Sequence, residues 1–211
     1  MANKTILWDY YRSSASYRVR IALNLAGISY TKNAIDLLAG EQRSLEHISR
    51  NPQGFVPVLD IDGVRLTQSL AILDYLDETR NLGLTPGTAI QKARIKAAAM
   101  TIAIDVHPIC NPSVVNHVTA GQEPARTEWM QHFIRPGLLA FEQLIAAPDF
   151  KIDDGPYAAG RNMSIADICL MPQIYNADRW GADYSDCPNI VAVRDECINH
   201  PAIQAAHPDN A

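Results

Sequence analysis

The sequence of 211 residues has few of the features that mark an oxidised or metal-binding protein. Its four cysteines, at positions 110, 169, 187 and 197, form no CxxC pair and have no zinc-ligand spacing. The six histidines form no HxxxH or HExxH motif, so the sequence predicts no metal site. Scattered cysteines of this kind are typical of reduced, packed thiols, and we therefore expect a cytoplasmic protein.

The sequence also lacks long apolar runs and an excess of positive charge. No segment approaches the roughly 18 apolar residues that a membrane span needs, and the N-terminal stretch has no apolar signal region. The formal net charge is -5, which argues against nucleic acid or an anionic membrane as the main partner. An anionic ligand must therefore be bound by a few local arginines. The hydrophobic content of 47% is typical of a soluble globular protein.

The first 80 residues alternate between strand-like and helix-like patterns. Apolar residues recur at i, i+3, i+4 and i+7 from Val19 onward, which predicts an amphipathic helix that ends at Gly27. Asp62 and Gly63 are a strong hairpin-turn signal between two short apolar runs. Ser69 stands where the N-cap of a further helix is expected. The order βαβ followed by αββα indicates an α/β domain.

The remainder of the chain is helical in period. Residues 81–87 contain glycine and proline and are the expected linker. Ser164 and Asp167 match a capping box at the start of a helix. Pro136 and Pro172 fall inside helical patterns, where we expect kinks or breaks. The sequence therefore predicts two domains, an α/β domain at residues 1–82 and an all-α domain at residues 88–211.

Chemistry is first indicated at the turn between the first predicted strand and helix, which holds Ser13, Ser14 and Ser16. Free backbone N–H groups and the positive end of the helix dipole converge at such a turn, so a thiol brought there is shifted towards thiolate. A serine hydroxyl can also donate a hydrogen bond to the sulfur. The alternative is that these serines only cap the helix, which is the commoner role of serine at a helix start.

Two further turns can complete a site for a peptide. Val56 precedes Pro57, and a cis proline there would expose the Val56 backbone to an extended peptide, whereas a trans proline would be an ordinary start of a strand. Gln68 and Ser69 begin the next helix, whose free N–H groups can accept a carboxylate, although Ser69 can also act only as a cap. The three turns match the thiol, the backbone and the γ-glutamyl carboxylate of glutathione.

Several motifs resemble the zeta class of glutathione transferases, which includes the maleylacetoacetate isomerases and the similar maleylpyruvate isomerases. The most specific is YRSSASYRVRIAL at residues 11–23. Further matches are NPQGFVP at 51–57, QSLAI at 68–72, HPICN at 107–111, the segment 164–172 and the tail from residue 207. The resemblance covers essentially the whole chain. It implies a glutathione transferase fold, with a thioredoxin-like domain before an all-α domain, and a homodimer.

The resemblance also implies roles for individual residues. Glutathione is the implied cofactor, and Ser13 is implied to donate to its sulfur with assistance from Ser14 and the adjacent backbone at Ala15. The other implied glutathione contacts are Gln42, Val56, Pro57, Gln68, Ser69, His107, Asn111 and Ser113. Arg12 and Arg179 match positions that bind the carboxylates of a small dicarboxylate or keto-acid substrate. From the residues alone, Arg12 is equally an exposed ion-pairing side chain, and Arg179 a cation that favours a helix C-terminus.

Two positions depart from the family pattern. Ala15 stands where the family usually has cysteine, which puts disulfide chemistry and reductive dehalogenation at this site in doubt. Some relatives carry an arginine within the segment 111–114, where this chain has Asn-Pro-Ser-Val. If that arginine binds a carboxylate, the substrate orientation or preference differs here.

The activity implied by the resemblance is cis–trans isomerisation of a maleyl keto acid, with glutathione regenerated, in the breakdown of aromatic compounds such as tyrosine or gentisate. The sequence does not separate maleylacetoacetate from maleylpyruvate. An alternative is a transferase that conjugates glutathione to small electrophiles, for which an apolar second pocket without paired arginines is expected. A third hypothesis, a binding protein without turnover, is disfavoured because the residues of all three turns are retained.

Overall fold

The computed structural model describes residues 4–210. The chain divides into two compact units. The first unit comprises Met1–Leu82 with Pro201–Ala211, and the second unit comprises Gly83–His200. No helix among residues 4–210 is both long and apolar enough to cross a membrane. The division differs from the predicted domains at the C-terminal end, where the last residues join the first unit.

A mixed sheet of four strands, in the order β2–β1–β3–β4, forms the centre of the first unit. The strands are β1 (Ile6–Asp9), β2 (Thr31–Ala34), β3 (Val58–Ile61) and β4 (Val64–Thr67). β1 is parallel to β2 and antiparallel to β3, which is antiparallel to β4. Asp62 and Gly63, with φ of 52° and 83°, form the predicted two-residue hairpin turn.

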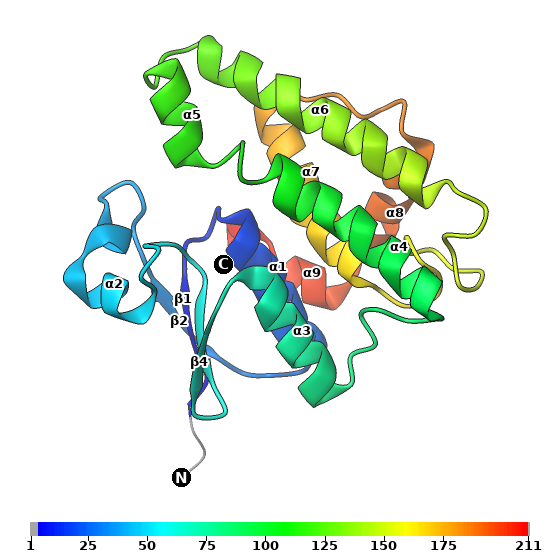
Figure 1. The fold of residues 1–211 in the computed structure, drawn as a ribbon, viewed down its shortest axis with the longest axis horizontal. Helices are drawn as coiled ribbons and strands as arrows, with labels where there is room; N and C mark the ends of the chain where they lie inside the picture. Colours follow the sequence, from blue (N-terminus) through cyan, green and yellow to red (C-terminus); the bar gives the residue numbers. More distant parts are fainter. Residues whose placement is uncertain (1–3, 211) are drawn as a thin grey trace. The chain divides into compact units, whose positions relative to one another are not determined.

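Helices cover both faces of this sheet, as Figure 1 shows. α1 (Ser14–Leu25) and α3 (Ser69–Arg80) lie on one side, and α2 (Leu45–Arg50), after the short helical turn η1 (Glu41–Arg43), lies on the other. This is the predicted βαβαββα order of a thioredoxin-like domain. The predicted N-cap at Ser69 is wrong by one residue, because Gln68 takes the capping position and Ser69 is the first helical residue.

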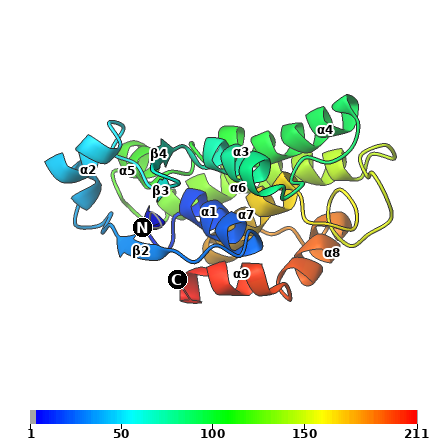
Figure 2. The same cartoon turned by 90° about the horizontal axis from the view of Figure 1, so that it is seen from below.

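The C-terminal segment belongs to the first unit because its helix α9 (Pro201–Ala206), which precedes the turn η3 (Pro208–Asn210), packs against α1 (Figure 2). Asn24 of α1 donates from Nδ2 to the Ala202 carbonyl at 3.0 Å. The Tyr17 ring meets the His207 ring edge-on, with 6.1 Å between their centroids. A helical pattern predicts the helix, but it does not reveal which unit the apolar face of that helix covers.

The second unit is entirely helical apart from its connections and one isolated bridge between Tyr157 and Gly160. Its helices are α4 (Ala89–Met100), the π-helical η2 (Thr101–Val106), α5 (Pro112–Thr119), α6 (Ala125–Ile145), α7 (Ile165–Trp180) and α8 (Pro188–Cys197). α7 packs against α4, α6 and α8, and most of its residues are buried. A helix that is apolar around most of its circumference is expected at the centre of such a bundle.

Two sequence predictions for the second unit have different outcomes. The capping box is confirmed, because the Asp167 carboxylate accepts hydrogen bonds of 2.7 Å from both the backbone nitrogen and the hydroxyl of Ser164. The breaks expected at prolines are absent, because α6 continues through Pro136 and α7 through Pro172. Each proline removes one backbone hydrogen bond, and the packing of these long helices outweighs that loss.

Gly137 permits a close approach within the second unit that the sequence did not reveal. A Cβ atom at this position of α6 would lie 2.2 Å from Cγ2 of Val106 in η2. Carbon atoms do not approach so closely, and a valine side chain has few rotamers by which to move away. The two helices therefore depend on a residue without a side chain at this crossing.

Candidate active site

The register of the sheet brings the three predicted turns to the same end of the sheet. Trp8 of β1 lies opposite Val58 of β3, and Val58 lies opposite Thr67 of β4. The turn after β1, the loop before β3 and the turn after β4 therefore lie at this end of the sheet. These segments carry all the predicted glutathione contacts of the first unit except Gln42, namely Ser13 to Ala15, Val56 with Pro57, and Gln68 with Ser69.

Ser13 is the N-cap of α1 and has one hydroxyl proton to spare. Its Oγ accepts a hydrogen bond of 3.2 Å from the backbone nitrogen of Ser16, so the cap uses an oxygen lone pair and leaves the hydroxyl proton available to an acceptor. Ser13 is half-buried, whereas Ser14 is buried. The capping alternative is thus fulfilled, yet it does not exclude donation to a sulfur at the helix N-terminus.

The loop before β3 presents backbone groups. The Val56–Pro57 peptide bond is cis. Among the described residues, neither the N–H nor the carbonyl of Val56 has a hydrogen-bond partner, so both can pair with an extended peptide. The preceding carbonyl, that of Phe55, is fixed by Nε2 of His47 at 3.0 Å and by Nδ2 of Asn51 at 2.9 Å.

Gln42 of η1 lies next to this loop. A Cβ at Gly54 would lie 3.0 Å from the Gln42 carbonyl oxygen, so the two backbones are in close contact. Oε1 of Gln42 is buried and has no hydrogen-bond partner among residues 4–210. A buried amide oxygen of this kind is satisfied when a ligand supplies a donor, so the residue fits its predicted role.

The turn after β4 leaves a helix N-terminus open. Gln68 has φ of 68°, a conformation uncommon for a residue with a side chain, and its side chain makes no capping bond to α3. Its Nε2 instead donates to Oε1 of Gln53 at 2.7 Å, which links this turn to the loop before β3. Ser69 is buried, and its Oγ accepts a 3.2 Å hydrogen bond from Nη1 of Arg18. The first N–H groups of α3 thus remain available to a carboxylate.

The predicted contacts of the second unit lie close together along one stretch of chain. His107 follows η2, and Asn111 is the N-cap of α5. The Oδ1 of Asn111 accepts hydrogen bonds from both the backbone nitrogen and the hydroxyl of Ser113, at 3.0 and 2.9 Å. Both polar side chains of this cap therefore bond to their immediate neighbours.

The two predicted substrate arginines are both exposed. The Arg12 guanidinium carbon lies 4.9 Å from the centroid of the Tyr11 ring. The Arg179 guanidinium carbon, in the last turn of α7, lies 5.8 Å from the Tyr175 ring centroid and 5.5 Å from that of Trp180. Neither arginine forms an ion pair with another residue in the described range 4–210, so both cations can accept an anionic partner.

The cysteines of the chain are poor candidates for a reactive thiol. All four are buried and outside disulfides. Burial raises the pKa of the Cys110 thiol to about 11, and burial raises that of Cys187 to about 11 as well, with a further contribution from Asp186. A thiol with such a pKa is almost entirely protonated at neutral pH and is a weak nucleophile. Thiolate chemistry at this site therefore requires a thiol from a ligand.

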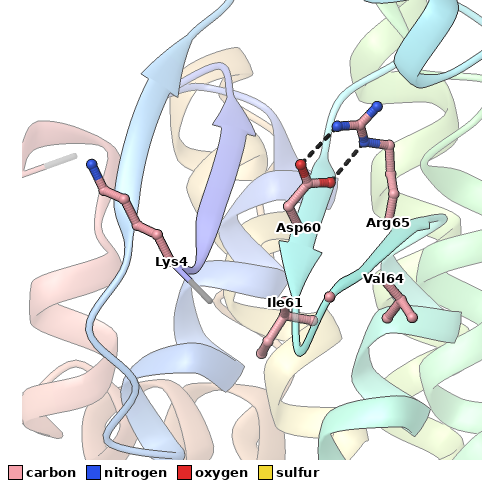
Figure 3. Close-up of a pocket in the computed structure, with 6 residues that line it drawn as sticks. Lys4, Asp60, Ile61, Val64 and Arg65 are labelled. Carbon is pink, nitrogen blue, oxygen red and sulfur yellow. Dashed lines mark hydrogen bonds and ion pairs between the residues drawn. The ribbon is translucent and has the colours of Figure 1, made fainter. Parts of the chain in front are cut away.

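A separate shallow hollow lies at the hairpin end of the sheet (Figure 3). It is lined by Lys4, Asp60, Ile61, Gly63, Val64 and Arg65. Nε and Nη2 of Arg65 each donate to the Asp60 carboxylate at 2.7 Å, so the charge of Arg65 is already paired. The β3–β4 turn is at the opposite end of the sheet from the three turns, and the hollow is distinct from the candidate site.

Comparison with known proteins identifies the family to which the chain belongs. Residues 3–78 match the family described as the glutathione S-transferase N-terminal domain. The maleylacetoacetate isomerase of Rhizobium meliloti is 53% identical over 215 residues, which cover 100% of this chain and 99% of that protein. A holo structure of a maleyl pyruvate isomerase, a bacterial glutathione S-transferase of the zeta class, has a TM-score of 0.91 and 33% identity and covers 98% of both chains. The chain belongs to the zeta-class glutathione transferase family.

A further structural relative has ligands of the expected kinds. The structure of maleylacetoacetate isomerase from Methylobacterium extorquens AM1 contains bound malonate and GSH. It matches this chain with a TM-score of 0.89 and 34% identity, over 98% of this chain and 97% of that one. A dicarboxylate and glutathione are thus both bound in a relative of closely similar fold.

Some site residues of this zeta-class chain were missed by the sequence reasoning. Arg18, His47 and Asn51 are buried and contact segments that carry the predicted glutathione contacts, through Ser69 or Phe55. One signal was available, because Arg18 lies four residues before Ala22 on the apolar face of the predicted helix. A charged residue on such a face is either misplaced or bonded to a specific partner.

Proposed function

We propose that this zeta-class chain is a glutathione-dependent cis–trans isomerase of maleyl keto acids, either maleylacetoacetate or maleylpyruvate. The observation that carries the proposal is that Ser13, the unpaired Val56 backbone and Ser69 lie at the same end of the sheet. The full-length similarity to a maleylacetoacetate isomerase favours this chemistry over other reactions of the fold.

In this proposal the three turns bind successive parts of glutathione. The N–H and carbonyl of Val56 pair with its cysteinyl backbone, and Gln42 supplies the buried Oε1 to a donor nearby. Ser69 and the open N-terminus of α3 bind the γ-glutamyl carboxylate. Gln68, His107, Asn111 and Ser113 complete the contacts as the resemblance implies. Ala15 presents a methyl group where the family that the chain resembles usually has a cysteine.

Bound glutathione supplies a thiolate, which adds to the cis double bond of the maleyl group and leaves after the resulting single bond has rotated. Ser13 stabilises that thiolate by donating its hydroxyl proton, and the N-terminus of α1 adds its positive dipole. Both effects lower the pKa of a thiol at this position. Ser14 is the second catalytic residue in the proposal, and its burial limits it to a supporting role.

Arginines provide the charge that the substrate requires. A maleyl keto acid carries two carboxylates, and a chain with a formal net charge of -5 repels such a dianion on average. Arg179 and Arg12, both exposed and without an ion-pair partner among the described residues, bind these carboxylates and stabilise the negative charge that develops on the keto-acid oxygen.

The proposed assembly is a homodimer in the cytoplasm, which acts in the breakdown of aromatic compounds such as tyrosine or gentisate. Exposed apolar side chains on α4 and η2 support the dimer: Ile90 is 65% exposed and Ile104 is 51% exposed. With Met100, these are three large exposed apolar residues on one helical stretch, and an exposed apolar surface of this kind is often covered in an assembly. Sedimentation equilibrium of the wild type and of Ile104→Glu tests this surface.

The activity is tested by incubating the protein with maleylpyruvate or maleylacetoacetate and following the vinyl protons by nuclear magnetic resonance. We expect the cis coupling to be replaced by the larger trans coupling only when glutathione is present. Accumulation of a thioether in place of the fumaryl product would identify a conjugating transferase and overturn the isomerase proposal. Comparison of the two keto acids by kcat/KM then identifies the preferred substrate.

A further inference from the structure

Two arginines of α1 are buried, although each carries a full positive charge. Arg18 is 2% exposed and Arg20 is 0% exposed. Removing a guanidinium from water costs several kcal/mol unless hydrogen bonds and counter-charges compensate for the loss. The two residues stand on either side of Val19, so they extend in different directions from the helix. Each contacts a different segment of the proposed glutathione site.

Arg20 connects the turn before Ser13 to two other parts of the first unit. Its Nη1 donates to both carboxylate oxygens of Asp9 at 2.8 Å, and its Nη2 donates to the Tyr11 carbonyl at 2.9 Å. Its Nε donates to the Ala206 carbonyl of α9 at 2.9 Å. A planar guanidinium with several bonds holds its acceptors in fixed directions. The backbone two residues before Ser13 is thereby fixed to β1 and to the C-terminal segment.

Arg18 reaches the other end of the site. Its Nη1 donates to Oγ of Ser69 at 3.2 Å, in an interaction buried between α1 and α3. A hydroxyl that accepts a bond from a guanidinium still has its own proton to donate. The bond therefore orients the Ser69 hydroxyl proton away from Arg18, and it places a buried positive charge behind a residue proposed to bind a carboxylate.

We propose that Arg18 and Arg20 are positioning residues that set the two ends of bound glutathione independently. Arg20 acts through the Tyr11 carbonyl on the sulfur end, where it holds Ser13 in place, and α9 contributes through the Ala206 carbonyl. Arg18 acts through Ser69 on the γ-glutamyl carboxylate. This assignment rests on the proposed glutathione site, but it does not depend on whether the reaction is isomerisation or conjugation.

The test compares Arg18→Lys with Arg20→Lys in the full-length protein, because lysine keeps the charge but not the planar fork of donors. Two quantities are measured by titration: the affinity for S-methylglutathione, which has no ionisable thiol, and the pKa of the bound glutathione thiol by ultraviolet absorbance. Arg65→Lys is the matched control, since Arg65 also donates two hydrogen bonds to a carboxylate, that of Asp60, but lies at the hairpin end of the sheet and away from the three turns.

We expect each arginine variant to change one of the two measured quantities and to leave the other unchanged. Arg20→Lys raises the pKa of the bound thiol by about one unit and lowers kcat by tenfold to about 100-fold, while the affinity for S-methylglutathione stays within about twofold of wild type. Arg18→Lys lowers that affinity about tenfold and leaves the thiol pKa and the kcat at saturating glutathione near wild type. Arg65→Lys changes neither quantity.

Equal changes of both quantities in both variants would mean that the arginines act only through general stability, and would overturn the proposal. If Arg20→Lys does not fold, Asp9→Asn in the full-length protein weakens the bonding of Arg20 instead and should raise the thiol pKa in the same direction. An unchanged pKa in that variant would equally overturn the proposal. A wild type that binds glutathione but isomerises nothing would refute the proposed reaction alone, because neither titration depends on turnover.

Discussion

The two units hold their proposed site residues in different ways. In the first unit, buried polar side chains support the three turns from behind, as Arg20 does for the Tyr11 carbonyl and His47 for the Phe55 carbonyl. In the second unit, Asn111 and Ser113 bond to each other, and the guanidinium of Arg179 is exposed and lies over aromatic rings. In the proposed site, the first unit thus contacts glutathione through groups that are held in place, whereas the second leaves the Arg179 side chain adjustable to the substrate.

The largest effect is expected at the sulfur end of the first unit. Ser13→Ala removes the hydroxyl that donates to the thiolate, so it should raise the pKa of bound glutathione and lower turnover by roughly 10²–10³-fold, the loss typical of one charge-stabilising donor. Absorbance of the thiolate against pH measures the first quantity, and steady-state kinetics the second. Ser14→Ala removes the hydroxyl of the second proposed catalytic residue and should have the smaller effect, and a larger effect there would show that the two serines have been assigned in the wrong order.

Arg179→Ala tests the proposed role of the second unit, in which an exposed arginine binds the substrate. It should lower kcat/KM for the keto acid by a factor that corresponds to about 2–3 kcal/mol of lost transition-state stabilisation, because a bond between two charged groups is lost. The affinity for glutathione should stay near wild type. The control is Arg126→Ala, since the Arg126 guanidinium also lies over the Trp180 ring, at 5.6 Å from its centroid. An equal loss in the two variants, or an equal loss with a neutral electrophile, would assign Arg179 a structural role.

Ser69→Ala should act on binding rather than on the chemical step. Loss of a hydrogen bond to a charged group predicts a decrease in glutathione affinity of about 1–3 kcal/mol, with little change of kcat at saturation. Because a ligand of the native state raises the melting temperature, a thermal shift series against glutathione concentration provides the measurement. An unchanged series would remove the carboxylate role from Ser69.

The smallest effect is expected for Gly137→Ala. Alanine usually stabilises a helix by about 1 kcal/mol relative to glycine. Here the added methyl would meet Val106 at 2.2 Å, so we expect a net destabilisation of about 1–2 kcal/mol. Urea unfolding measures the change, and the second substitution Val106→Ala should reverse part of it. A more stable Gly137→Ala variant would contradict this account of how α6 and η2 pack.

The sequence predicted the local structure of both units because local chemistry specifies it. The turn at Asp62 and Gly63 requires positive φ, and the capping box at Ser164 and Asp167 needs only four consecutive residues. Long-range contacts were not predictable in the same way. No periodic pattern reveals that α9 packs on α1, where its Ala206 carbonyl accepts from Arg20, because the acceptor is a backbone group common to all residues.

For the candidate site, the sequence predicted the side chains at the three turns but not those behind them. A serine at the start of a helix has a recognisable position, whereas His47 acts on the carbonyl of Phe55 only after the loop has folded back. The roles of the second-unit residues came from the resemblance to a family, and they remain predictions. The conformation of Gln68, at φ of 68°, had no signal in the sequence, since glutamine is not a residue that favours positive φ.

The most direct test of the proposed reaction is the number of keto-acid molecules converted for each molecule of glutathione. The thiol leaves the product again in an isomerase, so glutathione at one hundredth of the maleylpyruvate or maleylacetoacetate concentration should allow complete conversion to the fumaryl isomer, with the free thiol undiminished at the end. Conversion that stops after one equivalent, with the thiol consumed as a thioether, would contradict the account and identify the protein as a conjugating transferase.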